Sequence, residues 1–190
     1  IKSSIVNDFE IYCNKTKIYF ISICFYAGVL IGSLFSFIFI DRIGRRLTII
    51  IFIPIYIILL VGLKFLKPSY GYGCLYGIYA LLFVLGLFDF IIVIAILIYL
   101  AEIVKQTKVP YFVMILTGIS VGLSGILNTI FFKTSLDWRN IYLIFVGISG
   151  IVYILVFIFL IDSPIFALNN ENFDDFLINI RRIATMNGKT

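Results

Sequence analysis

The sequence has no histidine and few charged side chains. Of its 190 residues, 13% are charged and 62% are hydrophobic, whereas a soluble domain usually carries about 25% charged residues. So few charges cannot build a surface that faces water. The sequence therefore predicts an integral membrane protein, with the lipid bilayer as its first partner. The absence of histidine also removes the commonest general base and metal ligand.

Motifs that carry enzymatic or metal chemistry are missing as well. The three cysteines, Cys13, Cys24 and Cys74, do not have the spacing of a metal site. No sequence motif of a catalytic triad or of a phosphate-binding glycine loop is present. The net charge of +5 is spread along the chain without a basic cluster that contains aromatics, which excludes a nucleic-acid partner. We expect no enzyme activity, no cofactor and no metal.

What the sequence does have is long apolar stretches. Five of them are long enough to cross a hydrocarbon core of about 30 Å as helices. We therefore expect an all-α membrane bundle of five transmembrane helices within residues 18–163, preceded by an external or lumenal segment over residues 1–17. The predicted spans are residues 18–40, 47–63, 75–101, 109–132 and 140–161.

The remaining segment, residues 164–190, has a different pattern. Its apolar side chains recur at steps of three and four residues, with charges largely between them. This pattern is typical of an amphipathic helix that lies on a membrane surface. The apolar positions are Phe173, Phe176, Leu177, Ile180 and Ile183.

Small residues follow one face of several predicted spans. Gly28 and Gly32 form a G-x-x-x-G pair, and Gly118, Gly122 and Gly125 lie on one helical face. Small residues let membrane helices approach closely, so we interpret these faces as packing surfaces. A substrate path past the glycines is the alternative.

Two groups of charges are notable. Asp89 is the acidic residue deep in a span, where an ionised, unpaired carboxylate is costly and indicates a functional site. It could hold an organic cation, relay a proton, stay protonated or pair with a partner chain. The second group is the turn DRIGRR, with Asp41, Arg42, Arg45 and Arg46. We expect these charges to form a network with two acidic residues that end other spans on the same side, Glu102 and Asp162.

DRIGRR resembles the cytoplasmic loop between helices two and three of the major facilitator superfamily. Other segments resemble the organic cation/anion transporter branch of that superfamily, in the same order along the chain. These segments are SSIVNDFEIYC at 3–13, FYAGVLIGS at 25–33, YLAEIV at 99–104, DWRNIY at 137–142 and DSPIFAL at 162–168.

The resemblance implies that the five spans are helices two to six of a transporter that works by alternating access. It places the DRIGRR turn and the tail on the cytoplasmic or matrix side. The six charges of the network would gate transport of a small organic ion.

The sequence also departs from the family. Phe37 stands where the family has a glycine, and residues 80–83 lack the arginine that begins helix four. Helix one and helices seven to twelve have no counterpart here, so we expect the lone chain to be incomplete and inactive in transport. The alternative is a structural subunit of a larger membrane complex, such as a respiratory assembly in the mitochondrial inner membrane. Both hypotheses need other membrane chains to cover the bundle.

Overall fold

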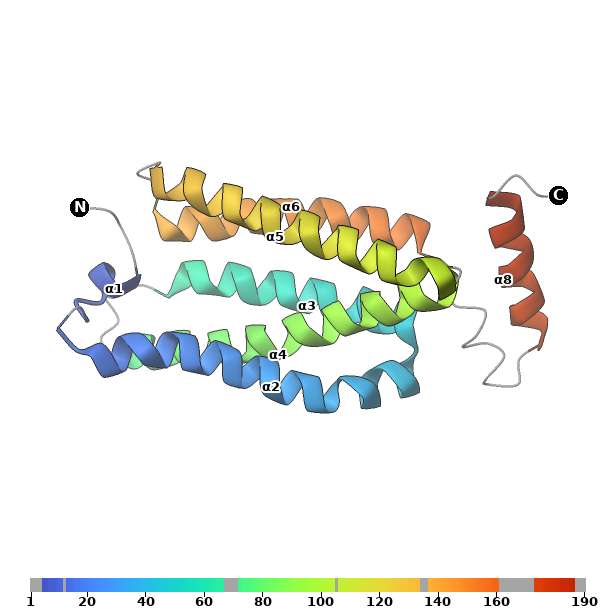
Figure 1. Ribbon diagram of the computed structural model, residues 1–190. Helices are drawn as coiled ribbons and strands as arrows, with labels where there is room; N and C mark the ends of the chain where they lie inside the picture. The colour runs from blue at the N-terminus through green and yellow to red at the C-terminus, as the bar shows by residue number, and fades with distance from the viewer. Residues whose placement is uncertain are drawn as a thin grey trace.

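The chain forms a bundle of long helices (Figure 1). A computed structural model describes residues 5–11, 13–66, 72–104, 106–133, 137–160 and 173–186. The helices are α1 (Ile5–Asp8), α2 (Lys15–Ile43), α3 (Arg45–Phe65), α4 (Tyr72–Ile103), the 3-10 turn η2 (Gln106–Lys108), α5 (Val109–Lys133), α6 (Trp138–Phe159) and α8 (Phe173–Met186).

Five of these helices, α2 to α6, are long and apolar enough to cross a membrane. Each predicted span coincides with one of them, and α2, α3 and α4 extend beyond the predicted ends by two or three residues. Helix α6 ends at Phe159, two residues before the predicted end of its span, and residue 161 lies outside the described residues. Large apolar side chains are exposed along these helices, as at Tyr26, Ile58 and Ile154, because lipid rather than water surrounds them. The prediction of an all-helical integral membrane protein is confirmed.

The closest packing in the bundle is between α2 and α4. A Cβ added at Gly28 would collide with the carbonyl oxygen of Phe83, and one added at Gly86 would collide with that of Phe25. At Gly32 the nearest atom would be the carbonyl oxygen of Leu87, at 2.5 Å. Glycine on both helices therefore brings the two backbones into direct contact, as small residues do where packing drives association in a membrane.

The buried core extends from this crossing to α3. Leu60 and Leu63 of α3 pack with Ile78, Leu82 and Leu85 of α4. A second cluster joins α2, α3 and α4 nearer the DRIGRR turn, and α6 packs against it. The members of the second cluster are Ile40, Ile49, Ile53 and Ala95, with Tyr153 and Val156 of α6 partly buried beside them.

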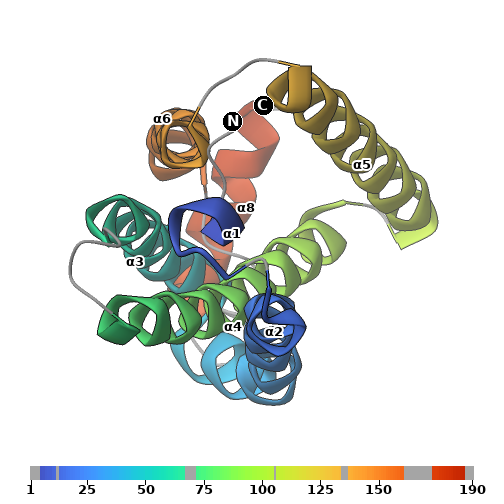
Figure 2. The ribbon, with the colours of Figure 1, turned by 90° about the vertical axis from the view of Figure 1, so that its left-hand side faces the viewer.

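Helix α5 stands apart from this packed core. Figure 2, viewed along the bundle, shows α5 separated from α2, α3 and α4. None of its described side chains is buried. A Cβ added at Gly118, Gly122 or Gly125 would meet no described atom within 4 Å. The glycine face of α5 therefore resembles that of α2 but has no helix against it in the described part of the chain.

The tail forms helix α8, which lies beyond the end of the bundle where α2 meets α3 (Figure 1). Its helical state over residues 173–186 agrees with the amphipathic pattern. The exposed apolar side chains include Phe173, Leu177 and Ile180. Its position on a membrane surface stays a prediction.

The glycine crossing gives a first prediction. Gly28→Ala should lower the free energy of unfolding by about 1–3 kcal/mol, because a methyl group there overpacks against backbone that cannot move aside. Gly118→Ala is the matched control. It meets open space, so the better helix propensity of alanine should leave stability unchanged or raise it by up to about 1 kcal/mol. Circular dichroism during denaturation with sodium dodecyl sulfate measures both, and equal midpoints for the two variants would contradict the crossing.

Candidate functional site

The DRIGRR turn consists of a single non-helical residue, Gly44. Its φ of 93° and ψ of 152° lie in a region that favours glycine. The Gly44 N–H donates to the Ile40 carbonyl at 3.1 Å. The buried Thr48 hydroxyl donates back to the Gly44 carbonyl at 2.7 Å. These bonds hold α2 and α3 in a tight hairpin and fix where the charges of the turn point.

Arg45 is the centre of the charge cluster. Its Nε lies 2.9 Å from Glu102 Oε1, and its Nη2 lies 3.5 Å from Asp41 Oδ1. The Arg45 and Glu102 side chains are only 13% and 10% exposed, whereas Asp41 is 66% exposed. The pair with Glu102 is therefore shielded from water, and the pair with Asp41 is at the surface.

The helix dipoles explain why these charges need each other. Arg45 begins α3, where the positive end of the helix disfavours a cation, and Glu102 lies in the last turn of α4, where the negative end disfavours an anion. Each charge offsets the field that disfavours the other. Glu102 Oε2 is buried and has no hydrogen-bond partner among the described residues, so the carboxylate has room for one more donor.

Three residues of the predicted network are in contact among the described residues. Asp41, Arg45 and Glu102 are in contact. Arg42 is exposed and Arg46 is partly buried at the same turn. Asp162 lies outside the described residues.

A second charge cluster, at the opposite end of the bundle, was missed by the sequence interpretation. The Trp138 indole N–H and Arg139 Nη1 both donate to Asp8 Oδ2, at 2.9 Å and 2.6 Å. Arg139 also donates to the Leu66 carbonyl at 3.4 Å, and its guanidinium lies 4.5 Å from the Trp138 ring centroid. This cluster ties α1 and the end of α3 to the start of α6. Both segments, 3–13 and 137–142, were noted as motifs, but the partners are 130 residues apart and no local pattern pairs them.

Asp89 lies near the middle of α4, partly buried. Tyr56 of α3 and Tyr142 of α6 both pack, partly buried, against the core cluster that contains Leu82 and Leu85 of α4. No ion pair or hydrogen bond reaches Asp89 from a residue that the structure describes. Asp89 is therefore a carboxyl in the membrane interior without a charged partner among the described residues.

Residues 6–186 match the Major Facilitator Superfamily. The chain belongs to the major facilitator superfamily. This is a family of solute transporters and not of enzymes. No curated protein and no solved structure matches the chain.

Membership in the superfamily confirms the family that DRIGRR indicated. The finer assignment to the organic cation/anion branch stays a prediction, because the match is to the superfamily as a whole and does not distinguish its branches. Phe37, which stands beside DRIGRR where the family has a glycine, is 60% exposed on α2.

The Arg45 cluster gives a prediction about stability. Glu102→Gln should lower the free energy of unfolding by about 3 kcal/mol, because it leaves the shielded Arg45 charge without its closest counter-charge. Asp41→Asn removes an exposed partner and should cost less than about 1 kcal/mol. Denaturation with sodium dodecyl sulfate again measures both. An Asp41→Asn effect as large as that of Glu102→Gln would contradict the ranking.

The Asp8 cluster gives a prediction about fluorescence, since Trp138 is the single tryptophan of the chain. Trp138 is 7% exposed, and Asp8→Ala removes the acceptor that holds its indole N–H. We expect red-shifted emission and stronger quenching by acrylamide. Glu10→Ala is the control, because Glu10 is exposed on the same segment. Unchanged emission in Asp8→Ala would show that α1 does not hold the start of α6.

Proposed function

We propose that this chain forms part of a transporter for a small organic ion that works by alternating access. The Arg45–Glu102 ion pair carries the proposal, because it joins the α2–α3 hairpin to the end of α4 at the family's signature turn. The turn and the tail that follows α6 face the cytoplasm or matrix in this proposal. The segment before α2 faces the other side.

A gate must hold in one state and open in the other. In the proposed mechanism, Asp41, Arg42, Arg45, Arg46, Glu102 and Asp162 hold one end of the bundle closed. The shielded pair resists separation, while the exposed Asp41 can release Arg45 at little cost. Because Glu102 Oε2 has no hydrogen-bond partner among the described residues, the carboxylate can accept from another donor when α4 moves relative to the turn.

The substrate would bind near Asp89 in this proposal. Asp89 offers a carboxylate to an organic cation, and a carboxylate in the membrane interior is costly unless a cation pairs with it. Asp89→Asn should abolish uptake of a cation and leave assembly intact. Unchanged transport together with unchanged assembly would remove Asp89 from an active role.

Transport also requires further helices that pack against α5. Alternating access needs two sets of helices that rock around a site between them, and the open face at Gly118, Gly122 and Gly125 is where further helices would pack. We therefore propose that the chain transports only together with other membrane helices and is inactive alone.

The second candidate is a structural subunit of a larger membrane complex that has lost transport. The bulky, exposed Phe37 beside the signature turn and the apolar residues 80–83 favour it, because both replace residues that the transporter resemblance requires. The open face of α5 would then bind neighbouring subunits.

Uptake into proteoliposomes tests the first candidate. The product of the full open reading frame, with any chains that co-purify, is reconstituted, and uptake of tetraethylammonium and p-aminohippurate is measured. We expect uptake of one of the two ions, reduced about tenfold or more by Glu102→Arg, which corresponds to about 1.4 kcal/mol. The charge exchange Arg45→Glu with Glu102→Arg should restore part of the rate. No uptake of either ion would overturn the transporter proposal.

A native gel in mild detergent tests the second candidate. A structural subunit should migrate in fixed stoichiometry with a large complex in the absence of any uptake activity. Migration as a free chain or a homo-oligomer would exclude the subunit role.

A further inference from the structure

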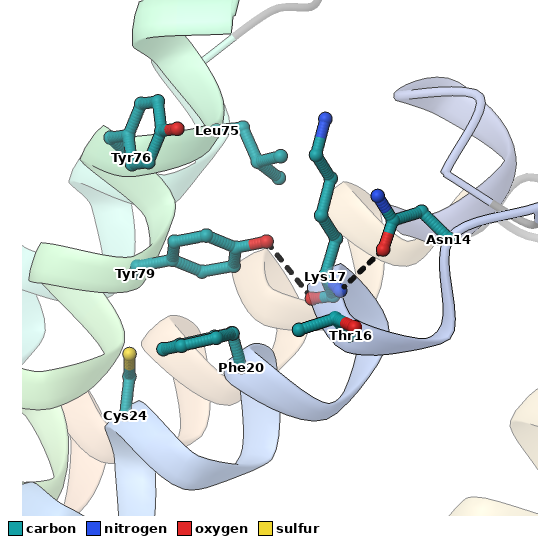
Figure 3. A pocket seen from close by; sticks show the side chains of 8 residues that line it. All are labelled: Asn14, Thr16, Lys17, Phe20, Cys24, Leu75, Tyr76 and Tyr79. Carbon is teal, nitrogen blue, oxygen red and sulfur yellow. Dashed lines mark hydrogen bonds between the residues drawn. The ribbon is translucent and has the colours of Figure 1, made fainter.

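A pocket of about 630 Å³ opens between the first turns of α2 and α4, at the end of the bundle opposite the DRIGRR turn. Its volume is within the range of about 300–1,000 Å³ that is usual for ligand pockets. Figure 3 shows Asn14, Thr16 and Lys17 at one end of it and Cys24 at the other, with the rings of Phe20 and Tyr79 between them. The pocket is therefore polar at one end and apolar at the other.

The walls of the pocket are held in place. Asn14 caps α2 by accepting from the Lys17 backbone N–H at 3.2 Å. The Tyr79 hydroxyl donates to the Lys17 carbonyl at 2.9 Å, which ties α4 to the start of α2. The Tyr79 ring lies 6.1 Å from the ring of Phe20 and 6.1 Å from that of Tyr76. These contacts form a wall of three aromatic rings beside the cavity.

The polar end of the pocket attracts negative charge. Lys17 lines it, with its ammonium group beside Leu75 in Figure 3, and α2 and α4 both begin there, at Lys15 and Tyr72. The first turn of a helix presents the positive end of its dipole and favours an anion. Three positive sources therefore face one rim, and the sequence places this rim at headgroup depth, where aromatic side chains also gather.

The apolar end determines what else the ligand contains. Cys24 lies seven residues after Lys17, or about 10 Å deeper along the helix. A free inorganic or sugar phosphate would leave this aromatic and apolar part of the pocket unfilled. We propose that the pocket binds an acidic phospholipid, with the phosphate at Lys17 and the first part of one acyl chain along Phe20 and Tyr79 toward Cys24. This site is separate from the proposed gate and from Asp89.

Protection of Cys24 from a small, membrane-permeant maleimide tests the proposal. Cys13→Ser and Cys74→Ser leave Cys24 as the reporter, and the protein is placed in nanodiscs of phosphatidylcholine with or without phosphatidylglycerol of the same acyl chains. We expect phosphatidylglycerol to slow labelling in a saturable manner. Lys17→Gln should weaken that protection about fivefold, as expected for one cation near a membrane surface.

Lys15→Gln is the matched control. It removes the same charge from the same helix end, but Lys15 does not line the pocket, so protection should remain. Equal protection by phosphatidylglycerol and phosphatidylcholine would overturn the preference for an acidic headgroup. Protection by glycerol 1-phosphate alone would overturn the lipid and indicate a free anion. No protection by any of these probes would overturn the site itself. The denaturation midpoint of each variant shows that it is folded.

Discussion

The direct contact of the α2 and α4 backbones is the constraint on which the rest of the structure depends. It exists because Gly28, Gly32 and Gly86 present no side chain where the helices cross. With the backbones this close, the ends of the two helices are also fixed relative to each other. The DRIGRR turn at one end then lies against Glu102, and at the other end the Tyr79 hydroxyl reaches the Lys17 carbonyl. The proposed gate and the proposed lipid pocket therefore lie at opposite ends of the α2–α4 helix pair.

Much of the architecture was predictable from the sequence because the membrane imposes it. Hydrocarbon requires long apolar helices, so composition and run length located all five spans within a few residues of α2 to α6. The Arg45–Glu102 contact could be anticipated because Arg45 precedes one predicted span and Glu102 follows another on the same side. The Asp8–Arg139 contact could not, since it depends on how α1 folds back over the bundle. Likewise, nothing in the spacing of Gly28 and Gly118 tells that one face is packed against α4 and the other is open.

The contrast between α2 and α5 links the fold to the proposed function. Both helices carry glycines along one face, but only the face of α2 meets another helix in the described part of the chain. In a membrane, close packing of small residues is a main source of helix association, so an open glycine face favours a further helix over lipid. Under the transporter proposal that helix belongs to the transport machinery. Under the subunit alternative it belongs to a neighbouring chain.

Photo-crosslinking from α5 in native membranes shows whether another helix packs on its glycine face. A benzoylphenylalanine introduced in place of Gly122 lies on the open face, and one in place of Ile58, which is 68% exposed on α3, serves as the reference for contact with lipid. We expect position 122 to form a crosslink to a polypeptide and position 58 to form adducts with lipid. Lipid adducts at both positions would show that the face of α5 is bounded by the bilayer and would contradict the claim that further helices complete this bundle.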